Sequence, residues 1–164
     1  LLDLGFERIA CLTGPEEHPR MADRLKGFTA ALMDRGKVFA PGLLHRTALT
    51  MEGGRNAARH LMSKPPHLRP QAIFALSDVM AIGLLHGLRE LGLTIPDDVS
   101  VVGYDDIEFA AYTFPPLTTV RQPAEELGTV AARTMIAHLD QEAPLPRSTA
   151  IRPQLVIRQS VRRP

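Results

Sequence analysis

The sequence has 164 residues and a net charge of +1, and its apolar share of 45% is ordinary for a soluble globular domain. No apolar run approaches the roughly 18 residues of a membrane-spanning helix, and the near-neutral charge gives no electrostatic basis for direct nucleic-acid binding. The single cysteine, Cys11, excludes an internal disulfide and fits a reducing compartment, so we expect a cytoplasmic protein without membrane association.

Apolar periodicity predicts alternating strands and helices in the first two thirds of the sequence. Residues 1–6 lack the basic segment and cleavage site of a signal peptide and resemble the tail of a helix that enters a strand, so we expect the sequence to begin inside a domain. Gly36 suits the end of the first helix, and Ser77-Asp78 supplies N-cap chemistry for the third. In chain order the expected elements are a strand at 8–13, a helix at 20–35, a strand at 43–46, a helix at 51–63, a strand at 71–76, a helix at 79–91 and a strand at 99–104.

The last third departs from this alternation. Residues 117–120 form a short strand candidate, and Pro123 suits the first position of a helix over residues 124–139. Residues 149–160 alternate in part and read as a final extended segment. Arg158, Arg162 and Arg163 gather at the C-terminus, where a solvated tail is favoured over a nucleic-acid-binding arm.

Three strand–helix units followed by a strand indicate an α/β fold, a doubly wound parallel sheet flanked by helices. In such sheets, ligands bind beyond the carboxyl ends of the strands. Four places are therefore candidates for a site: residues 13–24, 46–52, 77–78 and 105–106.

The sequence lacks the motifs of several common classes of enzyme and metal site. It contains no GxxxxGK[ST], GxGxxG, GxSxG, HExxH or CxxC motif, and its six histidines share no ligand spacing. Asp105, Asp106 and Glu108 form an acidic cluster that leaves a hard metal ion as an alternative, although only the first two follow a strand directly. We expect no metal, no cofactor and no enzymatic activity.

Five ordered motifs resemble the LacI/GalR family of transcription regulators. They are RLKGF (24–28), ALSDVMAIG (75–83), LGLTIPDDVSVVGYDDI (91–107), PLTTVRQP (116–123) and LVIRQS (155–160). The resemblance implies the second lobe of a type I periplasmic-binding-protein-like fold, in which an effector binds between two lobes. It assigns residues 1–117 to the second lobe, 118–123 to a hinge crossover, 124–150 to a helix and loop of the first lobe, and 151–164 to a return strand and tail. The DNA-binding head and most of the first lobe would precede Leu1.

The resemblance also implies an effector site. Arg24 and Asp105 follow two different strands at their carboxyl ends, and the family uses an Arg and an Asp there to hold effector hydroxyls. A charged donor and acceptor suit a sugar, and the alternative is an ion pair without a ligand. Ser77 stands where the family commonly has an effector-contacting Asn, unless it only caps the helix. Ala48 stands where the family often has a stacking aromatic residue.

A second apolar surface is predicted on the third helix. Val79 and Ile82 lie beside its wide apolar stripe and share a side with His86. The resemblance places a dimer contact on this lobe, so we assign these residues to it together with Tyr112 in the neighbouring segment 110–114. Burial in the core is the alternative. The stripe itself comprises Met80, Ala81, Leu84, Leu85, Leu88 and Leu91.

The hinge and the last helix complete the predictions. We expect the hinge strands near Val120, Arg121 and Gln122 and near Ile151. The helix over residues 124–139 has an apolar face whose partner would lie in the first lobe, so we expect it to dock on another copy, to detach or to pack abnormally. Its apolar residues are Leu127, Val130, Ala131, Met135 and Leu139.

These observations favour the effector-binding and dimerisation portion of a transcription regulator. The effector would be a small polar molecule, with a sugar favoured over a purine, and the homodimer would reach DNA only through the head that this sequence lacks. Half of the cleft is missing, so we expect weak effector binding or none. The alternatives are a solute-binding protein of a sugar transporter and a metal-dependent enzyme built on Asp105-Asp106.

Overall fold

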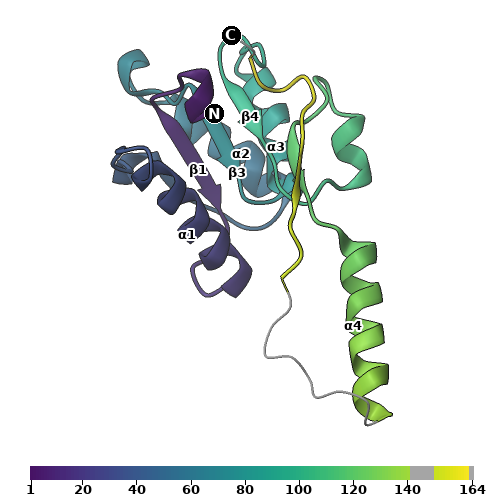
Figure 1. Ribbon diagram of the computed structural model, residues 1–164. Helices are drawn as coiled ribbons and strands as arrows, with labels where there is room; N and C mark the ends of the chain where they lie inside the picture. Colours follow the sequence, from purple (N-terminus) through teal and green to yellow (C-terminus); the bar gives the residue numbers. More distant parts are fainter. Residues whose placement is uncertain (141–149, 163–164) are drawn as a thin grey trace.

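The computed structural model describes residues 1–140 and 150–162 and contains a four-stranded parallel sheet (Figure 1). Its strands are β1 (Ile9–Thr13), β2 (Leu44–Arg46), β3 (Ala72–Ala75) and β4 (Ser100–Val102), in the order β2-β1-β3-β4. Cys11 of β1 pairs with Leu44 on one side and with Phe74 on the other. Every residue of β1 and β4 is buried, as expected for parallel strands covered on both faces.

Three helices connect these strands: α1 (Pro19–Met33), α2 (Met51–Met62) and α3 (Asp78–Glu90). The chain runs outward from β1 to β2 and then returns across the sheet to β3 and β4. Because parallel crossovers are right-handed, this reversal places α1 on one face and α2 and α3 on the other, as Figure 1 shows. The doubly wound parallel sheet predicted from the sequence is confirmed.

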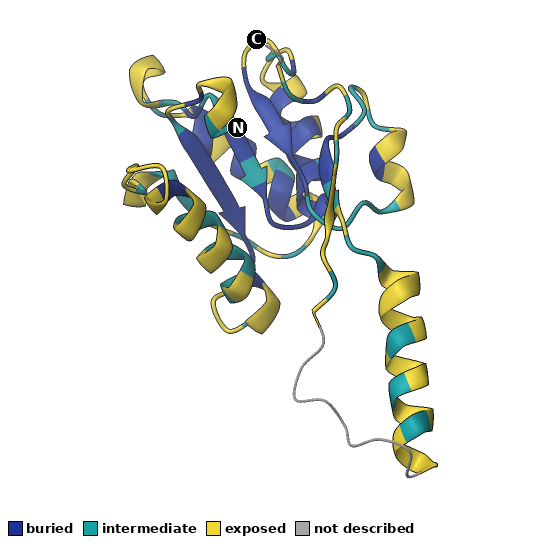
Figure 2. Cartoon of the chain, viewed as in Figure 1, coloured by how far each residue is buried: buried dark blue, intermediate teal, exposed yellow. Residues whose placement is uncertain are grey.

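The main core lies between the sheet and helices α2 and α3. Leu12, Ile73, Leu61 and Leu84 are fully buried there (Figure 2). A smaller cluster of Phe6, Ile9 and Ala72 packs against Phe28 of α1. Leu91, predicted to belong to the apolar stripe of α3, is instead exposed because the helix ends at Glu90.

Glycines allow α2 and α3 to pack backbone against backbone. A Cβ atom on Gly83 would lie 1.8 Å from the carbonyl oxygen of Met51, and one on Gly54 would lie 2.0 Å from that of Met80. No side chain fits at these distances, so the approach depends on glycine at both positions. The two helices form one rigid layer against the sheet.

A second, two-stranded sheet joins β5 (Thr119–Arg121) and β6 (Gln154–Val156) in antiparallel pairing, and we call this pair of strands the ribbon. The ribbon meets the main sheet at two isolated parallel bridges, between Val102 and Thr118 and between Asp105 and Arg121. It therefore lies next to β4, and its outer end leads toward the final helix (Figure 1).

The final helix, α4 (Ala124–Leu139), projects away from the rest of the molecule and buries none of its own residues (Figures 1 and 2). Leu127, Met135 and Leu139 of its predicted apolar face are exposed within the described part of the chain. Pro123 was expected at the first helical position but is the N-cap, because its ψ of 68° is not helical. The loop predicted at 141–149, and Arg163, lie outside the described residues.

Candidate functional site

Arg24 and Asp105 meet at the carboxyl edge of the parallel sheet. Arg24 extends from the second turn of α1, and its Nη2 lies 2.8 Å from Oδ1 of Asp105. Its Nη1 donates to the carbonyl oxygen of Leu76 at 2.6 Å, and its guanidinium carbon lies 3.9 Å from the centroid of the Tyr104 ring. The Arg24 side chain is 10% exposed and that of Asp105 is 24% exposed, so the carboxylate is the more accessible partner.

The backbone at Asp105 has an unusual conformation that directs its side chain toward this site. Asp105 and Asp106 have φ values of 124° and 55°, in the region that favours glycine. The Asp105 N–H donates to the carbonyl oxygen of Val120 at 2.9 Å, and its Oδ1 accepts a second hydrogen bond, from Nε2 of Gln122, at 2.5 Å. The predicted site and the predicted hinge therefore share one carboxylate.

Ser77 and Ala48 occupy loops at the same edge of the sheet. Ser77 follows β3 and is buried, but its hydroxyl does not cap α3, so the prediction of N-cap chemistry there is wrong. Ala48 lies between β2 and α2 and is exposed. Thr50, not singled out in the sequence, caps α2 by accepting the Gly53 N–H at 3.0 Å.

Two polar atoms of the segment between β1 and α1 have no partner. The hydroxyl of Thr13, at the end of β1, and Nδ1 of His18, just before α1, are buried without a hydrogen bond to any described residue. Buried polar groups without partners are rare in folded proteins and commonly mark a site for water or a ligand. Sequence periodicity gave no sign of either atom.

Asp106 turns away from Asp105 and binds two arginines of the ribbon region. Its Oδ2 accepts from Nε of Arg121 at 2.6 Å and its Oδ1 accepts from Nη2 of Arg158 at 2.7 Å. Burial raises the pKa of this carboxyl, but the hydrogen bonds and charges of the two arginines outweigh it, and the pKa lies below its ordinary value. The expectation of a merely solvated tail is therefore wrong for Arg158.

Asp78 is a buried carboxylate at the start of α3. Its Oδ1 accepts from the Thr119 hydroxyl at 2.6 Å and its Oδ2 from the N–H of Ile107 at 3.0 Å. Burial raises the pKa of Asp78, although these hydrogen bonds oppose the shift. The side chain ties α3 to the ribbon and to the loop after β4, a role hidden from sequence reasoning because Thr119 is 41 residues away.

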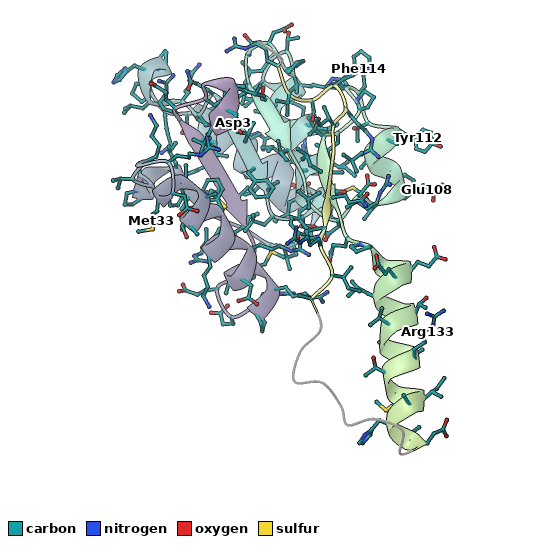
Figure 3. The ribbon with its side chains drawn as sticks, in the orientation of Figure 1. Asp3, Met33, Glu108, Tyr112, Phe114 and Arg133 are labelled. Carbon is teal, nitrogen blue, oxygen red and sulfur yellow. The ribbon has the colours of Figure 1, made fainter. Side chains whose placement is uncertain are left out.

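The residues predicted for a dimer contact form an outward surface. Val79 and Ile82 are half-buried and His86 is exposed on α3, and Ile82 also packs against the main core, as the alternative predicted. Tyr112 follows the 3-10 helix η4 (Glu108–Ala111), and Figure 3 shows it pointing away from the sheet, as Glu108 and Phe114 do. The Phe114 ring lies 5.4 Å from the guanidinium of Arg89, which makes the surface continuous with α3. Ala110, by contrast, is fully buried in the core.

The remaining predicted hinge residues flank the ribbon. Val120 of β5 pairs with Leu155 of β6. Ile151 precedes β6 in an extended segment and is half-buried. These positions join the body of the molecule to α4 and to the segment that returns from it (Figure 1).

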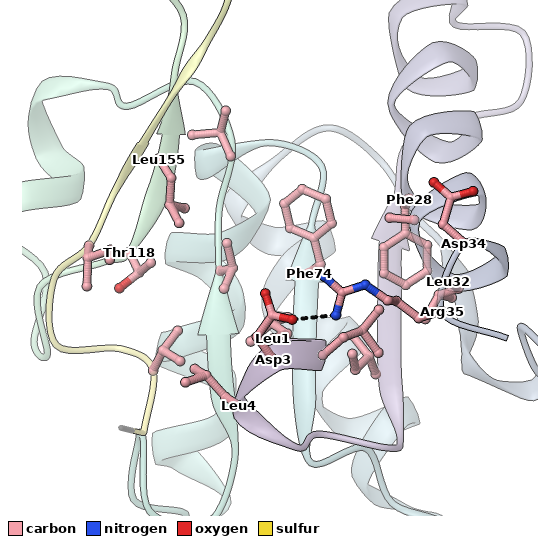
Figure 4. A pocket seen from close by; sticks show the side chains of 17 residues that line it. Leu1, Asp3, Leu4, Phe28, Leu32, Asp34, Arg35, Phe74, Thr118 and Leu155 are labelled. Atoms are coloured by element: carbon pink, nitrogen blue, oxygen red, sulfur yellow. Dashed lines mark hydrogen bonds and ion pairs between the residues drawn. The ribbon is translucent and has the colours of Figure 1, made fainter. Parts of the chain in front are cut away.

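A separate apolar groove of about 840 Å³ lies on the α1 side of the sheet, between α1 and the ribbon (Figure 4). Its walls include Phe28, Phe74 and Leu155, and an ion pair of Arg35 with Asp3 spans one side. None of Arg24, Ser77, Asp105 and Ala48 lines it. The groove is therefore distinct from the candidate site.

Neither metal binding nor membrane insertion finds support in the described residues. Over residues 1–140 and 150–162, no group of three His, Cys, Asp or Glu side chains could hold a metal ion. No helix in this part of the chain is long and apolar enough to cross a bilayer. The carboxylates of Asp105 and Asp106 both face arginines, which disfavours a cation between them.

Comparison with known proteins gives consistent results. Residues 1–161 match the family model of the periplasmic binding protein-like domain. The chain is 42% identical over 141 residues to the ribose operon repressor of Escherichia coli (strain K12), an alignment that covers 86% of this chain and 42% of that protein. It therefore spans less than half the length of this curated relative.

Solved structures of LacI-type regulators share the fold. A regulatory protein of the LacI family from Chloroflexus aggregans has a TM-score of 0.92 and 37% identity, covering 98% of this chain and 57% of that one. The complex of the transcriptional regulator CelR with cellobiose has a TM-score of 0.88 and 34% identity, covering 98% and 48%. The chain belongs to the periplasmic binding protein-like domain family, and within it resembles the domain of LacI-type transcription regulators.

Proposed function

We propose that this chain is the effector-binding and dimerisation portion of a LacI-type transcription regulator and that its effector is a sugar. The observation that carries the proposal is the contact of Arg24 with Asp105, a charged donor and acceptor held at the carboxyl edge of a parallel sheet. The curated relative is a repressor, and a similar regulator was solved with cellobiose. Both support this class of function over transport or catalysis.

The chemistry of the site suits a ligand rich in hydroxyl groups. A hydroxyl can accept from Arg24 and donate to Asp105, and so replace the direct ion pair without leaving either charge unpaired. The Thr13 hydroxyl and the His18 Nδ1 atom, both without a partner among the described residues, add hydrogen-bonding capacity in the segment between β1 and α1. Ser77 presents a short hydroxyl-bearing side chain, and Ala48 leaves space where a larger effector would fit.

The regulator as a whole would act as a cytoplasmic homodimer. Val79, Ile82 and His86 of α3 form one part of the dimer surface and Tyr112 another, because they are partly or fully exposed on one continuous side. A net charge of +1 does not favour direct DNA binding, so DNA contact falls to a separate head. The hinge would run through Val120, Arg121, Gln122 and Ile151 and join this lobe to the other.

Binding at the site can be tested by titrating the isotope-labelled chain with cellobiose and ribose while NMR follows the side-chain N–H signals of Arg24 and Gln122. One wall of a two-lobed site binds weakly, so we expect a dissociation constant of about 1 mM or weaker. Asp105→Asn should abolish the shifts, whereas Asp97→Asn, an exposed control, should keep them. Shifts that persist in Asp105→Asn, or that Asp97→Asn abolishes as well, would refute the proposed site.

A further inference from the structure

Adjacent carboxylates at the end of β4 bind two different parts of the molecule. Asp105 accepts from Arg24 on the side of the candidate site and from Gln122, which follows β5, and its own N–H donates to Val120 of β5. Asp106 accepts from Arg121 and Arg158, on the side of the ribbon. A single peptide unit therefore separates a carboxylate of the site from a carboxylate that holds the ribbon.

Asp106 binds one arginine at or beyond the end of each strand of the ribbon, in addition to the backbone bridges and the Thr119–Asp78 bond described above. Arg121 is the last residue of β5, and Arg158 lies two residues beyond β6. Arg158 also donates to the Leu117 carbonyl oxygen at 2.8 Å, and its backbone N–H donates to the Thr118 hydroxyl at 2.9 Å. The Asp106 side chain is only 5% exposed and that of Arg158 is 17% exposed, so water screens this ion pair less than the one with Arg121, whose side chain is 52% exposed.

The backbone between the two carboxylates has an unfavourable conformation and is held by contacts on both sides. Non-glycine residues at positive φ persist where surrounding contacts over-determine them, and here two such residues are consecutive. The contacts are the bond from the Asp105 N–H to Val120, the bond from the Ile107 N–H to Asp78 and the four side-chain bonds of the two aspartates. Loss of the side-chain bonds of Asp105 should allow the Asp105–Asp106 peptide to relax and so to shift the Asp106 carboxylate.

We propose that Asp106 is a positioning residue that couples the contacts of Asp105 to the order of the β5–β6 ribbon. Contacts at Asp105 fix the Asp105–Asp106 peptide, and this peptide holds the Asp106 carboxylate between Arg121 and Arg158. The identification of an effector at Asp105 rests on the proposed function, but the coupling itself is a property of the folded chain.

A double-mutant cycle in the complete 164-residue chain tests the coupling without any ligand. Hydrogen exchange of the backbone amides at 119–121 and 154–156 is measured for wild type, Arg24→Met, Asp106→Ala and the double variant. We expect Arg24→Met to accelerate ribbon exchange by about 5- to 30-fold in the wild-type background and by less than about 2-fold in the Asp106→Ala background. Equal acceleration in both backgrounds, or none in either, would overturn the proposal.

Two exposed residues supply matched controls. Arg20 lies on the same helix as Arg24, and Glu108 lies two residues beyond Asp106. Arg20→Met and Glu108→Ala should both leave the hydrogen-exchange rates of the ribbon amides unchanged. Asp106→Asn, which keeps the shape of the side chain, replaces Asp106→Ala if the latter fails to give a native circular dichroism spectrum. A sugar that binds at Asp105 but leaves ribbon exchange unaltered would refute the coupling and leave the proposed function standing. A positive cycle together with sugar-induced shifts that persist in Asp105→Asn would support the coupling and refute the proposed site.

Discussion

The close packing of α2 on α3 predicts a large effect from adding one methyl group. An alanine at position 83 would place its Cβ 1.8 Å from the carbonyl oxygen of Met51, far inside the roughly 3.5 Å of ordinary contact. The two backbones would have to separate by more than about 1 Å, and overpacking of a rigid interior costs about 3 kcal/mol. The higher helix propensity of alanine offsets about 1 kcal/mol of this cost. Gly83→Ala should therefore lower the free energy of unfolding by about 2 kcal/mol or more.

Urea unfolding followed by circular dichroism measures this change. Gly27→Ala is the matched control, because that glycine is also inside a helix but nothing lies within 4 Å of its would-be Cβ. The control should raise the free energy of unfolding by about 0.5–1 kcal/mol through helix propensity and the smaller entropy of the unfolded chain. A Gly83→Ala variant that matches the stability of Gly27→Ala would refute the reasoning from backbone approach.

Three further predictions concern the dimer surface, the cysteine and the ribbon. Ile82→Asp should weaken the proposed dimer at least about 30-fold in analytical ultracentrifugation, whereas Leu68→Asp, on the 3-10 helix η3 (Pro66–Leu68) and exposed, should not. Burial raises the pKa of the Cys11 thiol to about 12, so a disulfide reagent should label it at about pH 8 only after the chain is unfolded. Because the folded pKa of Asp106 is lowered from 3.8, its stabilising contribution is present above that value and is lost as the pH falls through the folded pKa. Wild type should therefore lose more stability than Asp106→Asn between about pH 5 and about pH 2.5, and equal losses would contradict this role.

Local patterns in the sequence were sufficient for the elements of the parallel sheet, whereas the contact of Arg24 with Asp105 also required the sheet topology and the family resemblance. The apolar spacing of residues 51–63 predicted α2 (Met51–Met62) almost to the residue, because its buried face is set by neighbours three and four positions apart. Arg24 and Asp105 could be brought together although they are 81 positions apart, because parallel strands end at one edge. The sheet topology thus predicted a contact that the spacing of apolar residues could not predict.

Contacts that depend on side-chain direction were missed. Ser77-Asp78 has the composition of an N-cap, but Asp78 points inward to Thr119 and Ser77 makes no cap bond. Arg158 lies near the C-terminus and was predicted to be part of a solvated tail, yet it binds Asp106, 52 positions earlier. Neither contact follows from periodicity, because each requires the ribbon to lie against β4, and ribbon pairing carries almost no sequence signal in strands of three residues.

The charges at the candidate site narrow the class of effector that the proposed function allows. A carboxylate ligand would gain a bond from Arg24 but would lie against the negative charge of Asp105, and a cationic ligand would face the reverse conflict. A neutral ligand with adjacent hydroxyls meets both charges, because each hydroxyl both donates and accepts. An apolar ligand would desolvate the ion pair of Arg24 with Asp105 and offer no hydrogen bond in return, which is unfavourable. In a titration of the chain, neutral polyols should therefore compete with cellobiose for the Asp105 site, whereas sugar acids and amino sugars should compete poorly. Tighter binding of a sugar acid than of its parent sugar would show that the ion pair does not set the selectivity.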